Sequence, residues 1–187
     1  MLRVDAFLFS ALAVAVAELG DKTQLLAFVL AARFGKPLPI VMGVLLATLG
    51  NHALAGMLGA WLGEGWHGPW LRFALGGSFL AMALWLLVPD KPDAPEAQAG
   101  RLGPFLVTLI AFFVAEMGDK TQVATIALAA HYRQAAAVVL GTTLGMMAVN
   151  VPSVLLGRAV LKLVPLRLTR PVAALLFVAL GTAAMLG

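Results

Sequence analysis

Six long apolar stretches dominate this sequence, and they restrict the chain to a lipid bilayer. They lie at about 5–33, 38–62, 69–88, 104–131, 135–157 and 168–186. Each is long enough to cross the hydrocarbon core, which takes about 20 helical residues. Hydrophobic residues make up 61% of the chain and charged residues 12%, whereas soluble domains are about half apolar and a quarter charged. The sequence therefore predicts an all-α membrane protein with six transmembrane helices.

The chain also repeats itself at an offset of 98 residues. This offset aligns Ala17–Gln24 (AELGDKTQ) with Ala115–Gln122 (AEMGDKTQ), and seven of the eight positions are identical. Without any gap, the same offset pairs Gly43 with Gly141. A single register kept over so much of the chain indicates an internal duplication.

Each repeat contains three predicted spans, so the second repeat enters the membrane from the opposite side. We expect a first repeat at 1–89, a cytoplasmic linker at 90–103 and a second repeat at 104–187, together forming one transmembrane domain. Two inverted repeats of this kind are typical of secondary transporters, which place their sites near the bilayer midplane.

Basic residues indicate how the chain is oriented. The side of the N-terminus holds three Lys and Arg residues, and the opposite side holds eight. The three are Arg3, Arg72 and Arg133, and the eight are Arg33, Lys36, Lys91, Arg101, Arg158, Lys162, Arg167 and Arg170. Because cytoplasmic loops are rich in Lys and Arg, we expect both termini outside. These loop positions also favour membrane orientation over a nucleic-acid partner as the reason for the net charge of +4.

Four of the nine acids lie near the middle of the first and fourth predicted spans. They are Glu18, Asp21, Glu116 and Asp119. A carboxylate at the bilayer centre costs at least about 2.5–3.5 kcal/mol, so these groups need a compensating cation. Within each motif the Glu and the Asp are three residues apart, a spacing that puts both on one face of a continuous helix.

Two lysines, Lys22 and Lys120, offer part of that compensation. Each follows its motif Glu by four residues, the favourable order for an ion pair on a helix. One alternative is that the charges close into such pairs and only hold the bundle together, but ionisable residues inside a membrane usually mark a functional site. Two lysines leave two of four negative charges unbalanced. One divalent cation or two protons would balance them.

The available side chains favour an oxygen-ligated ion. The chain has no Cys and three His, and carboxylate, amide and hydroxyl oxygens suit Ca²⁺, Mg²⁺ and Mn²⁺ rather than zinc. We expect no cofactor besides the transported ion. Gly20 and Gly118 inside the motifs permit either a local helix break or close helix packing.

Further polar residues are candidates to support the site. Besides the two lysines they are Thr23, Gln24, Asn51, His52, Thr121, Gln122 and Asn150. His52 and Asn150 correspond to each other in the two repeats. His52 can coordinate an ion, shuttle protons or bond a backbone carbonyl, and the sequence favours the last of these.

The doubled Glu-x-Gly-Asp-Lys-Thr motif in a six-span chain resembles the GDT-one-like family. This family includes transmembrane protein 165 relatives and bacterial manganese exporters, and it belongs with the cation/calcium exchanger superfamily. The resemblance extends over nearly the whole chain, and both motif copies match at every position. It implies transport of Mn²⁺ and/or Ca²⁺ against protons, with the four span acids as ligands. The short linker implies a multi-pass protein of the bacterial inner (cell) membrane.

These features favour a secondary transporter that exports divalent cations by alternating access at a four-carboxylate site near the midplane. A divalent-cation-selective channel is the alternative, because channels also use rings of acids, and a purely structural scaffold is a third. The sequence has no His-Glu-x-x-His motif and no grouped Ser/His/Asp set, so we do not expect an enzyme. The expected partners are a divalent metal ion, protons and the lipid bilayer.

Overall fold

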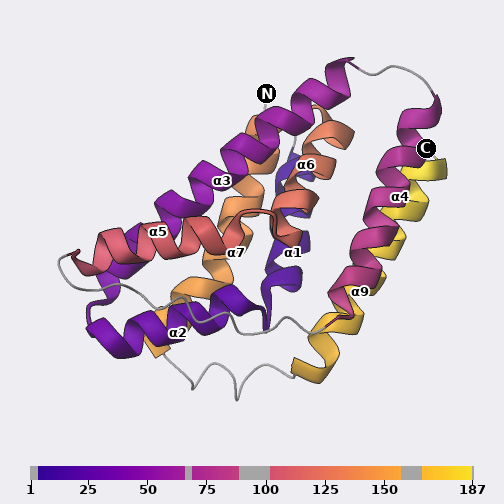
Figure 1. Ribbon diagram of the computed structural model, residues 1–187. Helices are drawn as coiled ribbons and strands as arrows, with labels where there is room; N and C mark the ends of the chain where they lie inside the picture. The colour runs from indigo at the N-terminus through magenta and orange to yellow at the C-terminus, as the bar shows by residue number, and fades with distance from the viewer. Residues whose placement is uncertain (1–3, 66–68, 89–101, 157–165, 187) are drawn as a thin grey trace.

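The computed structural model describes residues 4–65, 69–88, 102–156 and 166–186, and most of these residues are helical (Figure 1). In chain order the helices are α1 (Val4–Glu18), α2 (Lys22–Phe34), α3 (Pro37–Gly65), α4 (Pro69–Leu86), α5 (Pro104–Glu116), α6 (Lys120–Tyr132), α7 (Ala135–Leu156) and α9 (Leu166–Leu186). The prediction of an all-α chain is confirmed.

Four helices follow the predicted spans closely. α3, α4, α7 and α9 correspond to the spans expected at 38–62, 69–88, 135–157 and 168–186. Of these, α3 and α7 are long and apolar enough to cross a membrane by length and composition. Shorter apolar helices cover Arg72–Leu86, Pro104–Glu116 and Pro171–Leu186. Most of the predicted linker at 90–103 lies outside the described residues.

The first and fourth predicted spans are not continuous helices. In the first repeat α1 ends at Glu18 and α2 begins at Lys22, and the second repeat breaks at the same place in its motif. Between the helices, Gly20 has a φ of 81° and Gly118 a φ of 75°. This left-handed backbone is costly for residues that carry a Cβ. Of the two roles left open for these glycines, the structure shows the local break.

The break changes how the acids of one motif are related. Asp21 has φ −81° and ψ 170° and stands as the N-cap of α2, while Glu18 belongs to the last turn of α1. The expectation that both carboxylates share one helix face is therefore wrong. Each motif instead places its Glu at the end of one helix and its Asp at the start of the next.

Helices of one repeat pack on helices of the other. α1 packs along α7, and α5 packs along α3. A Cβ added to Gly43 of α3 would lie 2.9 Å from the carbonyl oxygen of Phe105, and one added to Gly141 of α7 would collide with the carbonyl oxygen of Phe7. Gly43 and Gly141 are 98 residues apart, and so are Phe7 and Phe105. The close contact of α3 with α5 is therefore repeated between α7 and α1, with the two repeats exchanged.

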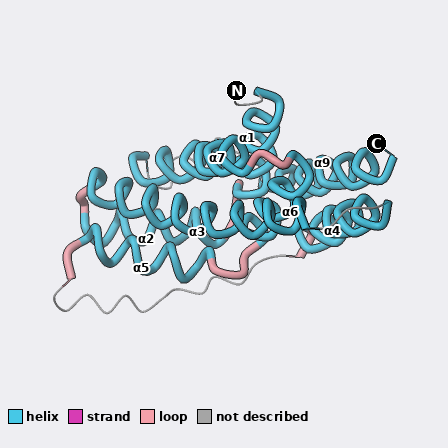
Figure 2. The backbone as a smooth tube through the Cα atoms, turned by 90° about the horizontal axis from the view of Figure 1, so that it is seen from above, coloured by secondary structure: helices cyan, strands magenta, loops and turns pink. Residues whose placement is uncertain are grey.

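The pair formed by α4 and α9 departs from this equivalence. The two helices cross closely, because a Cβ on Gly76 would lie 2.7 Å from the carbonyl oxygen of Gly181. α9 packs on α1, and α4 packs on α6. Figures 1 and 2 show α2 and α5 at the opposite end of the molecule. The α4–α9 pair thus covers α1 and α6 and leaves their counterparts, α5 and α2, without a comparable cover among the described residues.

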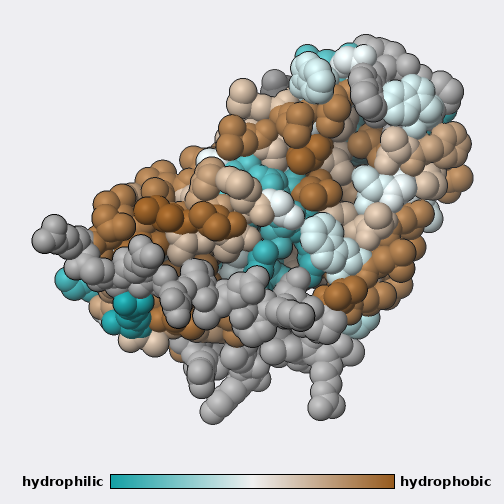
Figure 3. Space-filling model, in the orientation of Figure 1, coloured by the Kyte–Doolittle hydropathy of each residue, from teal (hydrophilic) through white to brown (hydrophobic). Residues whose placement is uncertain are grey.

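Large apolar side chains are exposed on many of the helices. Examples are Leu12 of α1, Leu54 of α3, Leu84 of α4 and Leu175 of α9. Figure 3 shows hydrophobic residues over much of the coloured surface on both sides of the polar middle. Hydrocarbon chains are a favourable surrounding for such side chains, and water is not.

The left-handed glycines provide a direct test of the break. Replacing Gly118 with Ala should lower stability by about 1–2 kcal/mol, because nothing lies within 4 Å of the added Cβ and only the backbone conformation is penalised. The matched control is Gly77→Ala, within α4, where the added Cβ also meets nothing and Ala is favoured in a helix. Thermal unfolding in detergent should show a loss for the first variant alone. Equal unfolding temperatures for both variants would contradict the observed backbone.

Candidate metal centre

The two helix breaks bring four carboxylates into the interior. Glu18 and Glu116 have no exposed surface, and Asp21 and Asp119 are 5% and 3% exposed. The charge of Glu18 is close enough to interact with those of Glu116, Asp21 and Asp119. Since like charges in a low-dielectric interior repel strongly, this group requires positive charge nearby.

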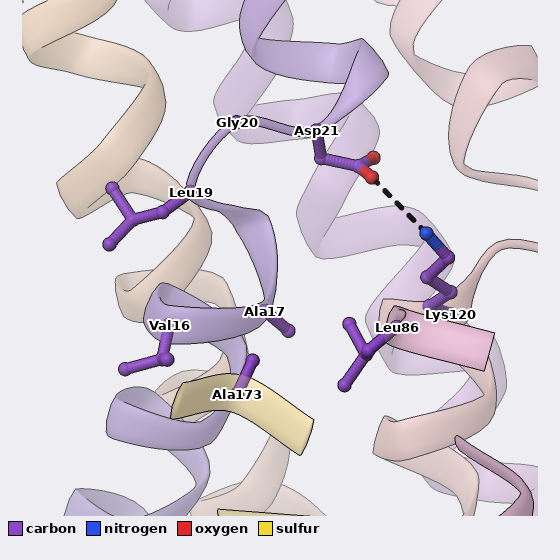
Figure 4. A pocket seen from close by; sticks show the side chains of 8 residues that line it. All are labelled: Val16, Ala17, Leu19, Gly20, Asp21, Leu86, Lys120 and Ala173. Carbon is purple, nitrogen blue, oxygen red and sulfur yellow. Dashed lines mark ion pairs between the residues drawn. The ribbon is translucent and has the colours of Figure 1, made fainter. Parts of the chain in front are cut away.

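That positive charge comes from the lysine of the opposite repeat. Lys22 Nζ lies 2.9 Å from Asp119 Oδ1, and Lys120 Nζ lies 3.7 Å from Asp21 Oδ1, as Figure 4 shows. The spacing within each motif left open a pair between the lysine and the Glu of its own motif, whereas these two ion pairs join each lysine to the Asp of the opposite repeat. Because the helix breaks after the Glu, the lysine is carried away from it and toward the other repeat.

The two glutamates have different neighbours. Thr121 donates its hydroxyl hydrogen bond to Glu116 Oε2 over 3.1 Å, and the Asn150 amide donates to Glu18 Oε1 over 3.5 Å. One oxygen of each remains without a hydrogen-bond partner among the described residues, namely Glu18 Oε2 and Glu116 Oε1. Buried carboxylate oxygens of this kind are available to a cation.

The motif glutamines hold the breaks in shape. Gln24 Oε1 accepts a hydrogen bond from the Gly20 amide over 2.9 Å, and Gln122 Oε1 accepts one from the Gly118 amide over 2.7 Å. Both glutamines therefore stabilise the left-handed glycine that follows each Glu. The side-chain oxygens of both glutamines thus bond the backbone of their own motif, whereas the sequence also allowed them to coordinate the metal ion.

The glutamine side chains also reach the long helices of the opposite repeat. Gln24 Nε2 donates to Ser153 Oγ of α7 over 3.1 Å, and Gln122 Nε2 donates to Asn51 Oδ1 of α3 over 3.4 Å. Asn51 in turn donates to the Phe113 carbonyl oxygen over 2.9 Å. Sequence reasoning missed Ser153, although its position three residues after Asn150 places it on the same face of α7.

Two candidate residues are buried without hydrogen-bond partners. Thr23 Oγ1 and both ring nitrogens of His52 have none within the ranges that the structure describes, and both residues have no exposed surface. The interpretation that favoured a bond from His52 to a backbone carbonyl is therefore wrong.

The acids do not form a finished coordination shell. Across the described ranges, no three His, Asp or Glu side chains are grouped so that they could hold a metal ion. Each Asp carboxylate is engaged by a lysine instead. Binding of one ion by all four acids therefore requires the crossed ion pairs to open or shift.

The surroundings of the two motifs also differ. A small pocket beside the first motif is lined by Leu19, Gly20 and Lys120 together with Leu86 of α4 and Ala173 of α9 (Figure 4). At the second motif Met117 is 59% exposed, and polar surface reaches the exterior in the middle of the face shown in Figure 3. Lys22 is 24% exposed, whereas Lys120 is 4% exposed. Leu86 of α4 and Ala173 of α9 therefore lie beside the first motif and Lys120 of the second, whereas Met117 of the second motif is exposed.

Fold and site together define a class of protein. A helical membrane chain with two copies of a buried acidic motif, each at a helix break, has the features of an ion transporter. The chain belongs to the family described as "Divalent cation/proton antiporter GDT1", which matches residues 6–94 and 104–187. The resemblance that the motifs indicated is thus confirmed, and one matched segment falls on each repeat.

A curated relative points the same way. A protein of Vibrio cholerae serotype O1 named "Putative manganese exporter" is 50% identical over 171 residues, which cover 91% of this chain and 85% of the relative. No solved structure matches the chain.

The crossed ion pairs can be tested by a double-mutant cycle on stability. We expect Lys22→Gln and Asp119→Asn to be coupled by about 0.5–3 kcal/mol, because each change alone leaves a charge without its partner. Lys22→Gln combined with Glu18→Gln is the matched comparison, since that pair was expected from spacing alone. Its coupling, from thermal unfolding in detergent, should be clearly smaller. A larger coupling energy for Lys22 with Glu18 than for Lys22 with Asp119 would favour pairing within one motif.

Proposed function

We propose that this protein is a secondary transporter that exports divalent cations, Mn²⁺ foremost, from the cytoplasm in exchange for protons. The observation that carries the proposal is the balance of buried charge. Four carboxylates lie in the interior, and two lysines face two of them. Two negative charges remain, which a single divalent cation would neutralise.

The same balance accounts for proton exchange. Two protons carry the same charge as one divalent cation, so two protonated acids would leave the interior equally neutral when the ion departs. We therefore propose Glu18, Asp21, Glu116 and Asp119 as the ion-binding acids. Each of the two glutamates keeps one buried carboxylate oxygen without a hydrogen-bond partner among the described residues, so the glutamates are the first to meet an entering ion.

The repeat contacts support an inverted arrangement of six spans. α1 with α2 forms one broken span, α5 with α6 forms another, and α3, α4, α7 and α9 complete the set. The equivalent contacts of α1 with α7 and of α5 with α3 are those expected of a two-fold axis between two units. In transporters built this way, sites lie between the repeats at broken helices.

The position of α4 and α9 supports alternating access. In the predicted topology α1 and α6 occupy the outer half of the membrane, and α2 and α5 the inner half. The α4–α9 pair packs on α1 and α6, so the arrangement is closed to the outside and open to the cytoplasm. Movement of this pair onto α5 and α2 would produce the opposite state, because those helices are the repeat counterparts of α1 and α6.

The names of similar proteins agree with this substrate. The V. cholerae relative is named for manganese export, and the family description names divalent cations and protons. We place the protein in a bacterial inner membrane with a cytoplasmic linker, and we retain Ca²⁺ as a second candidate substrate.

Transport by reconstituted protein tests the proposal. Proteoliposomes that contain a pH-sensitive dye should show proton movement when Mn²⁺ is added, with Ca²⁺ and Mg²⁺ assayed in parallel. Glu18→Gln and Glu116→Gln should each reduce Mn²⁺ flux at least about tenfold, equivalent to about 1.4 kcal/mol. Glu64→Gln, at an exposed position near the end of α3, should retain full flux. Metal flux without a proton signal would contradict the proposed exchange for protons, and ohmic single-channel currents would support the channel alternative.

Thiol labelling tests the direction of opening. The chain has no Cys, and Leu19 and Met117 correspond to each other in the two repeats. Met117→Cys should react with a membrane-impermeant thiol reagent from the cytoplasmic side, because this position is exposed. Leu19→Cys should react more slowly, because Leu19 is less exposed than Met117 and lines the pocket beside the first motif. Faster labelling of Leu19→Cys from the cytoplasmic side would contradict the proposed state.

A further inference from the structure

His52 corresponds in the other repeat to Asn150, a residue that contacts one of the buried acids. It is fully buried in α3, and neither ring nitrogen has a hydrogen-bond partner among the described residues. A buried polar group without a partner loses the hydrogen bonds that water provided, so most such groups are satisfied in folded proteins. The exception at His52 calls for a ligand that visits the ring.

The repeat indicates where the ring stands. Asn150, the counterpart of His52, lies on α7 and contacts Glu18 at the end of α1. The contact of α3 with α5 repeats that of α7 with α1, as the glycine contacts at Gly43 and Gly141 show. The equivalent position for His52 is therefore beside Glu116, at the end of α5.

A direct contact supports this placement. Asn51, the neighbour of His52 in α3, donates its hydrogen bond to the carbonyl oxygen of Phe113, in the last turn of α5. Glu116 Oε1 is also without a hydrogen-bond partner among the described residues. A buried imidazole and a buried carboxylate oxygen near one helix end are two donor atoms of the type that a transition-metal ion uses.

The two donor types distinguish between candidate ions. Ca²⁺ is bound by oxygen ligands, whereas Mn²⁺ also accepts imidazole nitrogen, as in carboxylate sites that combine Glu with His. Resting on the function proposed above, we propose that His52 supplies a nitrogen ligand to the transported ion beside Glu116 and so favours Mn²⁺ over Ca²⁺. Asn150, in the equivalent place, offers an amide oxygen that suits either ion.

Pulsed electron paramagnetic resonance on the purified full chain with Mn²⁺ tests the ligand directly. A nitrogen nucleus bound to Mn²⁺ modulates the electron spin echo, and the wild-type protein should show this modulation. His52→Asn, which copies the residue of the other repeat, should lose it. His131→Gln should retain it, because His131 packs against Tyr132 and Phe79, 4.9 Å and 6.5 Å away between ring centres, at the far end of α6 from the motif.

Competition binding tests the selectivity. The measurement is equilibrium binding to the purified protein, so it does not depend on transport. The ratio of Mn²⁺ to Ca²⁺ affinity should fall roughly tenfold or more in His52→Asn and His52→Gln, the size of effect seen when a metal site loses a supporting group. Thermal unfolding identifies whichever of the two variants stays folded, and that variant decides the test.

The outcomes separate this inference from the proposed function. Mn²⁺ binding without nitrogen modulation in the wild type, or an unchanged affinity ratio in a folded His52 variant, would overturn the role of His52 and leave the transporter proposal intact. Failure of the wild type to bind either metal would overturn both.

Discussion

The crossed pairing of each buried Asp with the lysine of the opposite repeat is the interaction on which the rest of the structure depends. Lys22 reaches Asp119, and Lys120 reaches Asp21. Neither repeat can balance its own acids in this way, because each supplies the cation that the other needs. Removing one buried charge from such a pair typically costs about 3–5 kcal/mol, so the two halves are electrostatically interdependent inside the membrane.

The helix breaks make that pairing possible. A continuous helix would carry Glu, Asp and Lys of one motif along a single face and join them to one another. The left-handed glycine ends the helix after the Glu, and the following glutamine accepts the glycine amide hydrogen bond and ties the turn to the opposite repeat. Small residues on α3 and α7 then allow α5 and α1 to approach closely enough for the charges to meet.

The sequence predicted the helical class from its composition, and one register indicated the duplicated motif, whose four acids are buried in the structure. It could not decide between a break and close packing at Gly20 and Gly118, since a glycine permits both. It did not indicate that each lysine reaches the Asp of the opposite repeat, because spacing along a chain predicts contacts only while the helix continues. The position of Leu86 and Ala173 beside the first motif depends on packing between distant segments, which no local pattern records.

The breaks also orient backbone dipoles within the bilayer. α1 and α5 end at the acids, so their partially negative carbonyl ends point toward the glutamates, while α2 and α6 begin there with partially positive amide ends near the aspartates. The peptide backbone thus adds a fixed electrostatic field, which attracts a cation at the end of the first helix of each break and stabilises an anion at the start of the second. Substituting an acid does not remove this field, and part of the attraction for an ion belongs to the main chain itself.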